Sequence, residues 1–128
     1  MRPVNLFLTE SGVLKMGYYG LTTQTECYSI KGIDCEGVRS FGPEVFKGEY
    51  EMKSDVWSLG IALIEMMGIT PYVKYENNCL PTMSRYYKYP FNEYDMEASE
   101  FLIDFLQTCF ECVHARQDVK WLLNVSVL

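Results

Sequence analysis

The stretch KSDVWSLGIALIEMM, Lys53 to Met67, decides the fold of this chain. Its apolar residues fall on every side of a helix, and after Asp55 its only charged residue is Glu65. A helix that is apolar all round is typical of the middle of a domain. Ser54 is a favourable N-cap, Asp55 suits the positive end of the helix dipole, and Gly68 ends the helix. We therefore predict a buried central helix that starts at Ser54.

Shorter elements precede this helix. Two apolar runs, Val4 to Leu8 and Val13 to Tyr18, surround a Thr-Glu-Ser-Gly sequence and predict a β-hairpin. Residues 21–42 show no hydrophobic period and predict a long loop. Residues 69–95 are mixed in character and rich in Tyr, with RYYKYPFNEY at their centre.

Two further helices are predicted after this region. We expect Asp95 to cap the first, and the helix carries an apolar stripe at spacings of three and four. The stripe consists of Ala98, Phe101, Leu102, Phe105, Leu106, Cys109 and Val113. Val119, Leu122 and Leu123 predict a short last helix. The expected fold class is mainly α with a small β-hairpin, in one domain.

Composition excludes several classes of partner. The chain has 128 residues, 48% of them hydrophobic, and a net charge of −6, which disfavours binding to nucleic acid or to an anionic membrane. No apolar run reaches the roughly 20 residues of a membrane span, and the run Leu6–Leu8 is too short for a signal peptide. Five cysteines, an odd number, argue against a disulfide framework. We expect a cytoplasmic protein.

The order of five short motifs resembles a protein family. GPE, Gly42 to Glu44, precedes SDVWSLG, with Glu44 eleven residues before Asp55. Together the two motifs resemble the C-terminal lobe of a eukaryotic protein kinase of the Ste20-like serine/threonine type. RPVNLFL resembles the Lys-Pro-x-Asn stretch of the family, and MGYYGL occupies the position of its metal-binding Asp-Phe-Gly motif. CFECVHARQDVKWLL resembles the last segment of the kinase domain. The resemblance implies that residues 1–128 are a partial kinase domain, a C-lobe with the N-lobe absent.

The resemblance assigns structural roles rather than chemical ones to most matching residues. It implies that Arg116 pairs with Glu44 and that Asp55 caps the backbone of the catalytic loop. The residues with an implied structural role are Gly20, Pro43, Glu44, Asp55, Trp57, Gly60 and Arg116.

Phosphoryl transfer in this family needs ATP, magnesium, a glycine-rich loop, a Lys–Glu pair, and Asp and Asn side chains. Asn5 matches the catalytic-loop Asn, and counting back from it places the catalytic Asp before Met1. Tyr18 stands where the magnesium-binding Asp belongs, and a phenol is neutral at pH 7. We therefore expect no catalytic residue, no metal site and no cofactor. We favour Asn5 as a relic of the nucleotide site, and a polar turn residue is the alternative.

The activation-like segment departs from the family as well. Val38 stands where the family has a Thr at the substrate site, and Gly42 replaces the Ala of Ala-Pro-Glu. Phosphorylation could order this loop by pairing with Arg, and a plain solvated loop is the alternative. The candidate acceptors are Thr22, Thr23, Thr25, Tyr28, Ser29 and Ser40.

Two clusters have a structural and a functional interpretation. Cys109, Cys112 and His114 suggest zinc, but a second Cys pair is missing, so we favour cysteines packed in the core. Region 72–94 either fills the core under the last helices or binds a protein partner. Its aromatic residues are Tyr86, Tyr87, Tyr89, Phe91 and Tyr94.

Three functional hypotheses follow from the sequence. The first is an inactive pseudokinase remnant that acts, if at all, by binding protein. The second is a fragment of a longer serine/threonine kinase in a signalling cascade, in which case Met1 is not the true start. The third is a half-domain without a selected function, whose uncovered apolar surface invites aggregation or an obligate partner.

Overall fold

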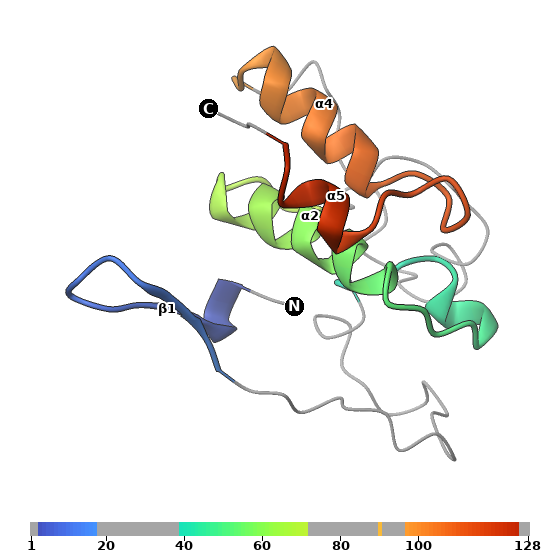
Figure 1. The fold of residues 1–128 in the computed structure, drawn as a ribbon, viewed down its shortest axis with the longest axis horizontal. Helices are drawn as coiled ribbons and strands as arrows, with labels where there is room; N and C mark the ends of the chain where they lie inside the picture. The colour runs from blue at the N-terminus through green and yellow to red at the C-terminus, as the bar shows by residue number, and fades with distance from the viewer. Residues whose placement is uncertain (1–2, 18–38, 72–89, 91–96, 126–128) are drawn as a thin grey trace.

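The computed structural model describes residues 3–17, 39–71, 90 and 97–125, and these form three α-helices and a small sheet (Figure 1). The first elements are η1 (Pro3–Asn5), β1 (Leu6–Leu8) and β2 (Leu14–Met16). They are followed by η2 (Val45–Lys47), α2 (Ser54–Met66), α4 (Glu100–Cys109) and α5 (Val119–Leu122). The predicted class, mainly α with a β-hairpin, agrees with the described part of the chain.

Helix α2 is the predicted central helix, with a small correction at its start. The N-cap is Lys53, and the Ser54 hydroxyl instead accepts a hydrogen bond from the Glu51 N–H at 3.4 Å. Gly68 adopts a φ of 78°, a conformation that ends helices and that glycine adopts without strain. The helix is not covered on every side, because the Met66 side chain is 61% exposed.

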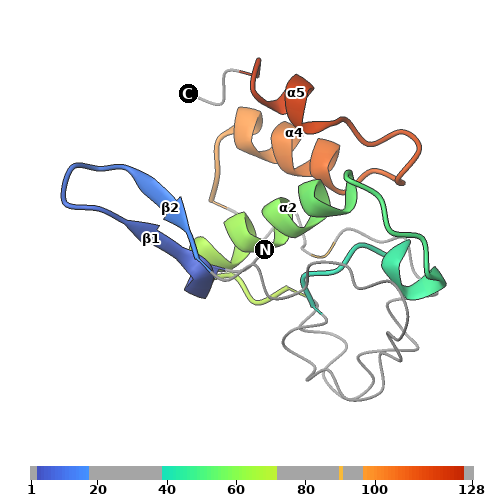
Figure 2. The ribbon, with the colours of Figure 1, turned by 60° about the horizontal axis from the view of Figure 1, so that its bottom comes forward.

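The core lies between α2 and α4, which pack against each other in both ribbon views (Figures 1 and 2). Trp57 of α2 meets Phe110 edge-on, with ring centroids 5.0 Å apart. Gly60 makes this contact close, since a Cβ on it would lie 2.7 Å from the Phe110 ring. The core consists of Val56, Trp57, Ile61, Ile64, Phe105, Leu106, Cys109 and Phe110.

Helix α4 begins later than predicted. Ser99 is its N-cap, with a side chain that accepts the Leu102 N–H at 3.3 Å, whereas Asp95 lies outside the described residues. The predicted apolar stripe is correct for the second half of the helix. It is wrong for Phe101, which is 69% exposed. The short helix α5 occupies the predicted place, and its Leu122 packs against the core.

Strands β1 and β2 form the predicted hairpin, although both are shorter than the apolar runs that indicated it. They pair antiparallel, with Phe7 opposite Lys15. The turn closes through a bond from the Thr9 N–H to the Val13 carbonyl at 2.9 Å, and Gly12 has a φ of 79°. Both ribbon views show the hairpin extending away from the helices (Figures 1 and 2).

Some predictions concern segments outside the described residues. The loop 21–42 is described only from residue 39, and the Tyr-rich region 72–94 only at Pro90. Within the described ranges, no helix combines the length and the apolar character needed to cross a bilayer.

Candidate functional site

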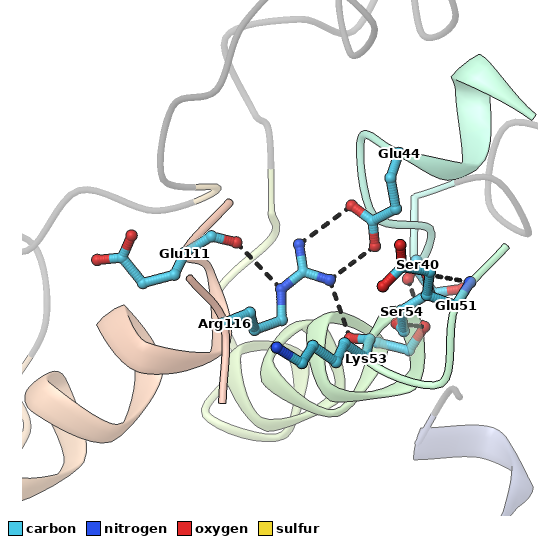
Figure 3. Close-up of polar contacts among 8 residues, drawn as sticks. Ser40, Glu44, Glu51, Lys53, Ser54, Glu111 and Arg116 are labelled. Carbon is cyan, nitrogen blue, oxygen red and sulfur yellow. Dashed lines mark hydrogen bonds and ion pairs between the residues drawn. The ribbon is translucent and has the colours of Figure 1, made fainter. Parts of the chain in front are cut away.

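The side chain of Arg116 lies at the centre of a buried polar cluster, drawn in Figure 3. Its Nη1 lies 2.6 Å from Glu44 Oε1 and its Nη2 lies 3.1 Å from Glu44 Oε2. Arg116 is 1% exposed and Glu44 is 3% exposed, so water does not screen the pair. Two parallel bonds between a guanidinium and a carboxylate are among the strongest hydrogen bonds in proteins. The pairing that the kinase resemblance implies is present in the structure.

The same guanidinium reaches two more segments of the chain. Its Nη1 donates to the Lys53 carbonyl at 2.9 Å, and its Nε donates to the Glu111 carbonyl at 3.0 Å (Figure 3). The backbone N–H of Arg116 donates to the Cys112 carbonyl at 2.8 Å, which closes the turn that carries the side chain inward. A single arginine thus joins the segment before η2, the start of α2 and the turn after α4.

Burial and pairing act in opposite directions on Glu44. Burial by itself raises the pKa of this carboxyl. Hydrogen bonds from Arg116, from the backbone and from Ser54, together with the Arg116 charge, outweigh the burial and hold the pKa below its ordinary value of 4.5. The cluster at neutral pH is therefore a guanidinium paired with an ionised carboxylate.

Trp57 joins the polar cluster to the apolar core. The centre of the Arg116 guanidinium lies 4.9 Å from the centroid of the Trp57 ring, which is within the range of a cation–π contact. Ser58, the next residue of α2, donates a buried hydrogen bond to the Ser40 carbonyl at 2.7 Å. These contacts fix α2 against the end of the activation-like segment.

Gly42 has a role in this cluster that sequence comparison missed. A Cβ at this position would lie 2.7 Å from the Glu44 Cδ and would also clash with both carboxylate oxygens. Arg116 holds that carboxylate in place, so it cannot move aside freely. Glycine at the family's Ala position is therefore matched to the local packing. No signal short of the structure indicates this, because the sequence shows only the substitution.

The cysteine cluster separates into one buried and one exposed thiol. Cys109 is buried in the core as predicted, and its burial raises the pKa of the thiol to about 12, although the Arg116 charge opposes this. Cys112 and His114 are exposed, so the core interpretation is wrong for Cys112. Within the described residues, no three His, Cys, Asp or Glu side chains come together as metal ligands.

The residues expected around nucleotide and metal are only partly described. Asn5 is half-buried at the end of η1, and its carbonyl accepts the Gly17 N–H at 2.8 Å. Tyr18 and Gly20 lie outside the described residues. Asp55 is exposed at the start of α2, and the described part of the chain offers no partner for its side chain. Its implied role as a cap of the catalytic loop stays a prediction.

The comparisons with known proteins agree on one family. The sequence matches the family described as protein tyrosine and serine/threonine kinase over residues 1–122. It is 33% identical over 117 residues to the mast/stem cell growth factor receptor kita of Danio rerio, covering 84% of this chain and 12% of that protein. It is 30% identical over 124 residues to mitogen-activated protein kinase kinase kinase 3 of Mus musculus, covering 91% of this chain and 19% of that protein.

A shorter match leads to a third kinase. The serine/threonine-protein kinase Nek9 of Xenopus laevis is 33% identical over 72 residues, which are 55% of this chain and 8% of that protein. The chain spans less than a fifth of the length of each of these relatives, since the shares are 12%, 19% and 8%. A family match over residues 1–122 covers nearly all of the sequence, and the chain belongs to the protein tyrosine and serine/threonine kinase family.

Proposed function

We propose that this chain forms a kinase-type C-terminal lobe over residues 1–128 that does not transfer phosphate and acts by binding protein. The observation that carries the proposal is Tyr18 at the position of the magnesium-binding Asp. Magnesium prefers hard anionic oxygen ligands, and a neutral phenol is a poor replacement for a carboxylate. The buried Arg116–Glu44 pair supports the same proposal, because it keeps the scaffold while the metal position has changed.

The described residues do not fit a magnesium–nucleotide site. The side chain of Asn5 offers one neutral oxygen near the base of the hairpin. No group of three or more candidate ligands of the His, Cys, Asp or Glu type occurs in the described ranges.

Calorimetric titration of the purified chain with ATP, with and without magnesium, tests the proposal. We expect no binding that depends on magnesium and no phosphate transfer to a generic protein substrate. Tyr18→Asp restores the family's carboxylate, and Tyr50→Asp is the matched control at an exposed tyrosine. Saturable magnesium-dependent ATP binding by the unaltered chain, absent from a heat-denatured sample, contradicts the proposal.

A second candidate function is part of a longer serine/threonine kinase of the Ste20-like type, acting in a signalling cascade. The order of the motifs favours it, as does the small share of each relative that this chain covers. Sequencing of the 5′ end of the transcript distinguishes the two. A continuous reading frame with His-Arg-Asp just before Met1 supports the longer kinase, with Tyr18 as its remaining defect. A stop codon in frame supports the binding function.

The proposed partner is a protein that contacts region 72–94, where five aromatic residues lie within a short stretch. We also propose that the protein is cytoplasmic, because five cysteines, an odd number, do not suggest the disulfide framework of a secreted protein. Replacing Tyr86, Tyr87 and Tyr89 with Ser should abolish partner capture by the tagged chain in cells, while fluorescence of the same tag reports its location.

A further inference from the structure

The β1–β2 hairpin exposes much of its apolar surface. Five of its apolar side chains are between 45% and 72% exposed. They are Phe7, Leu8, Val13, Leu14 and Met16, and Val4 of the neighbouring η1 is 68% exposed. A two-stranded sheet is only marginally stable in water and gains stability from a third strand or a packed face. The hairpin therefore presents a surface that association would stabilise.

The hydrogen bonds of the hairpin show which backbone groups point to its outer edges. The Thr9 N–H bonds to the Val13 carbonyl, and the Gly17 N–H bonds to the Asn5 carbonyl. Because bonded pairs alternate along an antiparallel ladder, Phe7 directs its backbone groups toward β2. The intervening residues direct theirs outward.

On the outer edge of β1 these outward groups are available. They are the carbonyl of Leu6 and both the N–H and the carbonyl of Leu8, and none of them has a partner within the described residues. An extended strand that lies along β1 meets an acceptor and a donor at the right spacing for a third strand.

The two edges of the hairpin differ in charge. Strand β1 contains Leu6, Phe7 and Leu8 and has no charged residue. Strand β2 has Lys15 at its centre, and a lysine is a common protection of an edge strand against pairing. If two copies paired antiparallel through β2, two Lys15 side chains would face each other, which is unfavourable. Of the two described strands, only β1 lacks a charged residue that protects its edge.

We propose that β1 is a homodimerisation edge, which pairs antiparallel with β1 of a second copy around a two-fold axis at Phe7. In this arrangement the Leu8 N–H of each copy donates to the Leu6 carbonyl of the other. The two Phe7 residues form a non-hydrogen-bonded pair, with Cα atoms about 4.5 Å apart and aromatic rings in contact.

Charge also favours a second copy over a charged partner. The chain carries a net charge of −6, so two copies repel each other over most of their surface. Residues 3–17 contain only Glu10 and Lys15 as charged residues, which sum to zero. The hairpin is therefore a place where self-association meets little repulsion. This inference does not depend on the proposed loss of phosphoryl transfer.

Sedimentation equilibrium of the full chain with Phe7→Lys tests the proposal. We expect the unaltered chain to dimerise as its concentration rises, and the variant to dissociate at least about tenfold more readily, since it loses an aromatic pair and places two lysines in contact. Phe101→Lys is the matched control, because Phe101 is exposed on α4 and should leave dimerisation unchanged. A chain that stays monomeric, or equal effects of both variants, overturns the proposal.

A cross-linking experiment covers the case in which Phe7→Lys does not fold. Phe7→Cys and Lys15→Cys are compared in a Cys112→Ser background, which removes an exposed native thiol. We expect mild oxidation to give a dimer joined through position 7 and much less through position 15, identified by mass spectrometry of the linked peptides. A link through position 15 alone indicates pairing at β2 and contradicts the β1 interface. No link at either position indicates that another surface or another protein covers the hairpin.

Discussion

Replacing Arg116 with Ala removes the centre of the buried cluster. The substitution deletes both bonds to Glu44 and the bonds to the Lys53 and Glu111 carbonyls. It leaves a carboxylate that is 3% exposed without a cation, and stranding a buried charge costs roughly 3 to 5 kcal/mol. Because domains are stable by only about 5 to 15 kcal/mol, we expect most of the expressed Arg116→Ala protein to be insoluble.

Urea denaturation followed by tryptophan fluorescence measures the effect on the soluble fraction. Lys120→Ala is the matched control, since this cation is exposed on α5. The double variant Glu44→Gln, Arg116→Met should regain much of the lost stability, because it removes both charges together. If Arg116→Ala is as soluble as Lys120→Ala and unfolds at the same urea concentration, the buried pair does not stabilise the fold.

The acid stability of the pair, the packing at Gly60 and the reactivity of the two cysteines can each be measured. Because the pKa of Glu44 is lowered, its pair with Arg116 contributes its full stability above the ordinary pKa of 4.5. This contribution is lost as the pH falls through the lowered pKa. The Tm of the unaltered chain should therefore fall more steeply between pH 7 and 3 than the Tm of Glu44→Gln. Gly60→Ala places a Cβ 2.7 Å from the Phe110 ring and should lower the free energy of unfolding in urea by about 1 to 3 kcal/mol. Iodoacetamide should label Cys112 in the native protein and Cys109 only after unfolding, as mass spectrometry can establish, because Cys109 is buried and its pKa is raised to about 12.

Each of these predictions has an outcome that contradicts it. Equal pH profiles for Glu44→Gln and the unaltered chain mean that the pair contributes little. Met66→Ala is the control for Gly60→Ala, because Met66 is exposed on the same helix, and a similar loss in both variants means that close packing at Gly60 is unimportant. Labelling of Cys109 at the rate of Cys112 means that the core opens readily.

The central helix could be predicted from local sequence because its signals are local. An apolar run closed by Gly68 gave the extent of α2 almost to the residue. The same run overstated its burial, since the pattern shows which residues are apolar and not how much of the surrounding structure covers them. Met66 is the result, an apolar side chain on the helix that remains 61% exposed.

Helix α4 shows where local signals compete. Asp95 and Ser99 are both favourable N-caps. The apolar spacing of Ala98 and Phe101 favoured a helix that begins at Asp95, the earlier of the two. The structure uses Ser99, and Phe101 then falls on the side that α2 does not cover. The choice between two caps depends on tertiary packing, which the periodicity of one segment does not contain.

The buried pair could be predicted only through the family resemblance. Glu44 and Arg116 are 72 residues apart, and neither stands in a local pattern that indicates burial or pairing. Neither local sequence nor the family resemblance explains the glycine at position 42, because a side chain is excluded there by the position of the Glu44 carboxylate. Local sequence thus defines the helices, while contacts between distant segments define the cluster.

The 72-residue separation of Glu44 and Arg116 has a consequence for how the sequence can change in length. Contact between the two residues closes a long loop, and the entropy of closing a loop grows only with the logarithm of its length, by about 0.6 kcal/mol for each doubling. The chain between α2 and α4 can therefore gain or lose many residues at small cost to the pair. Insertions in region 72–94 should therefore leave the bonds between Arg116 and Glu44 in place.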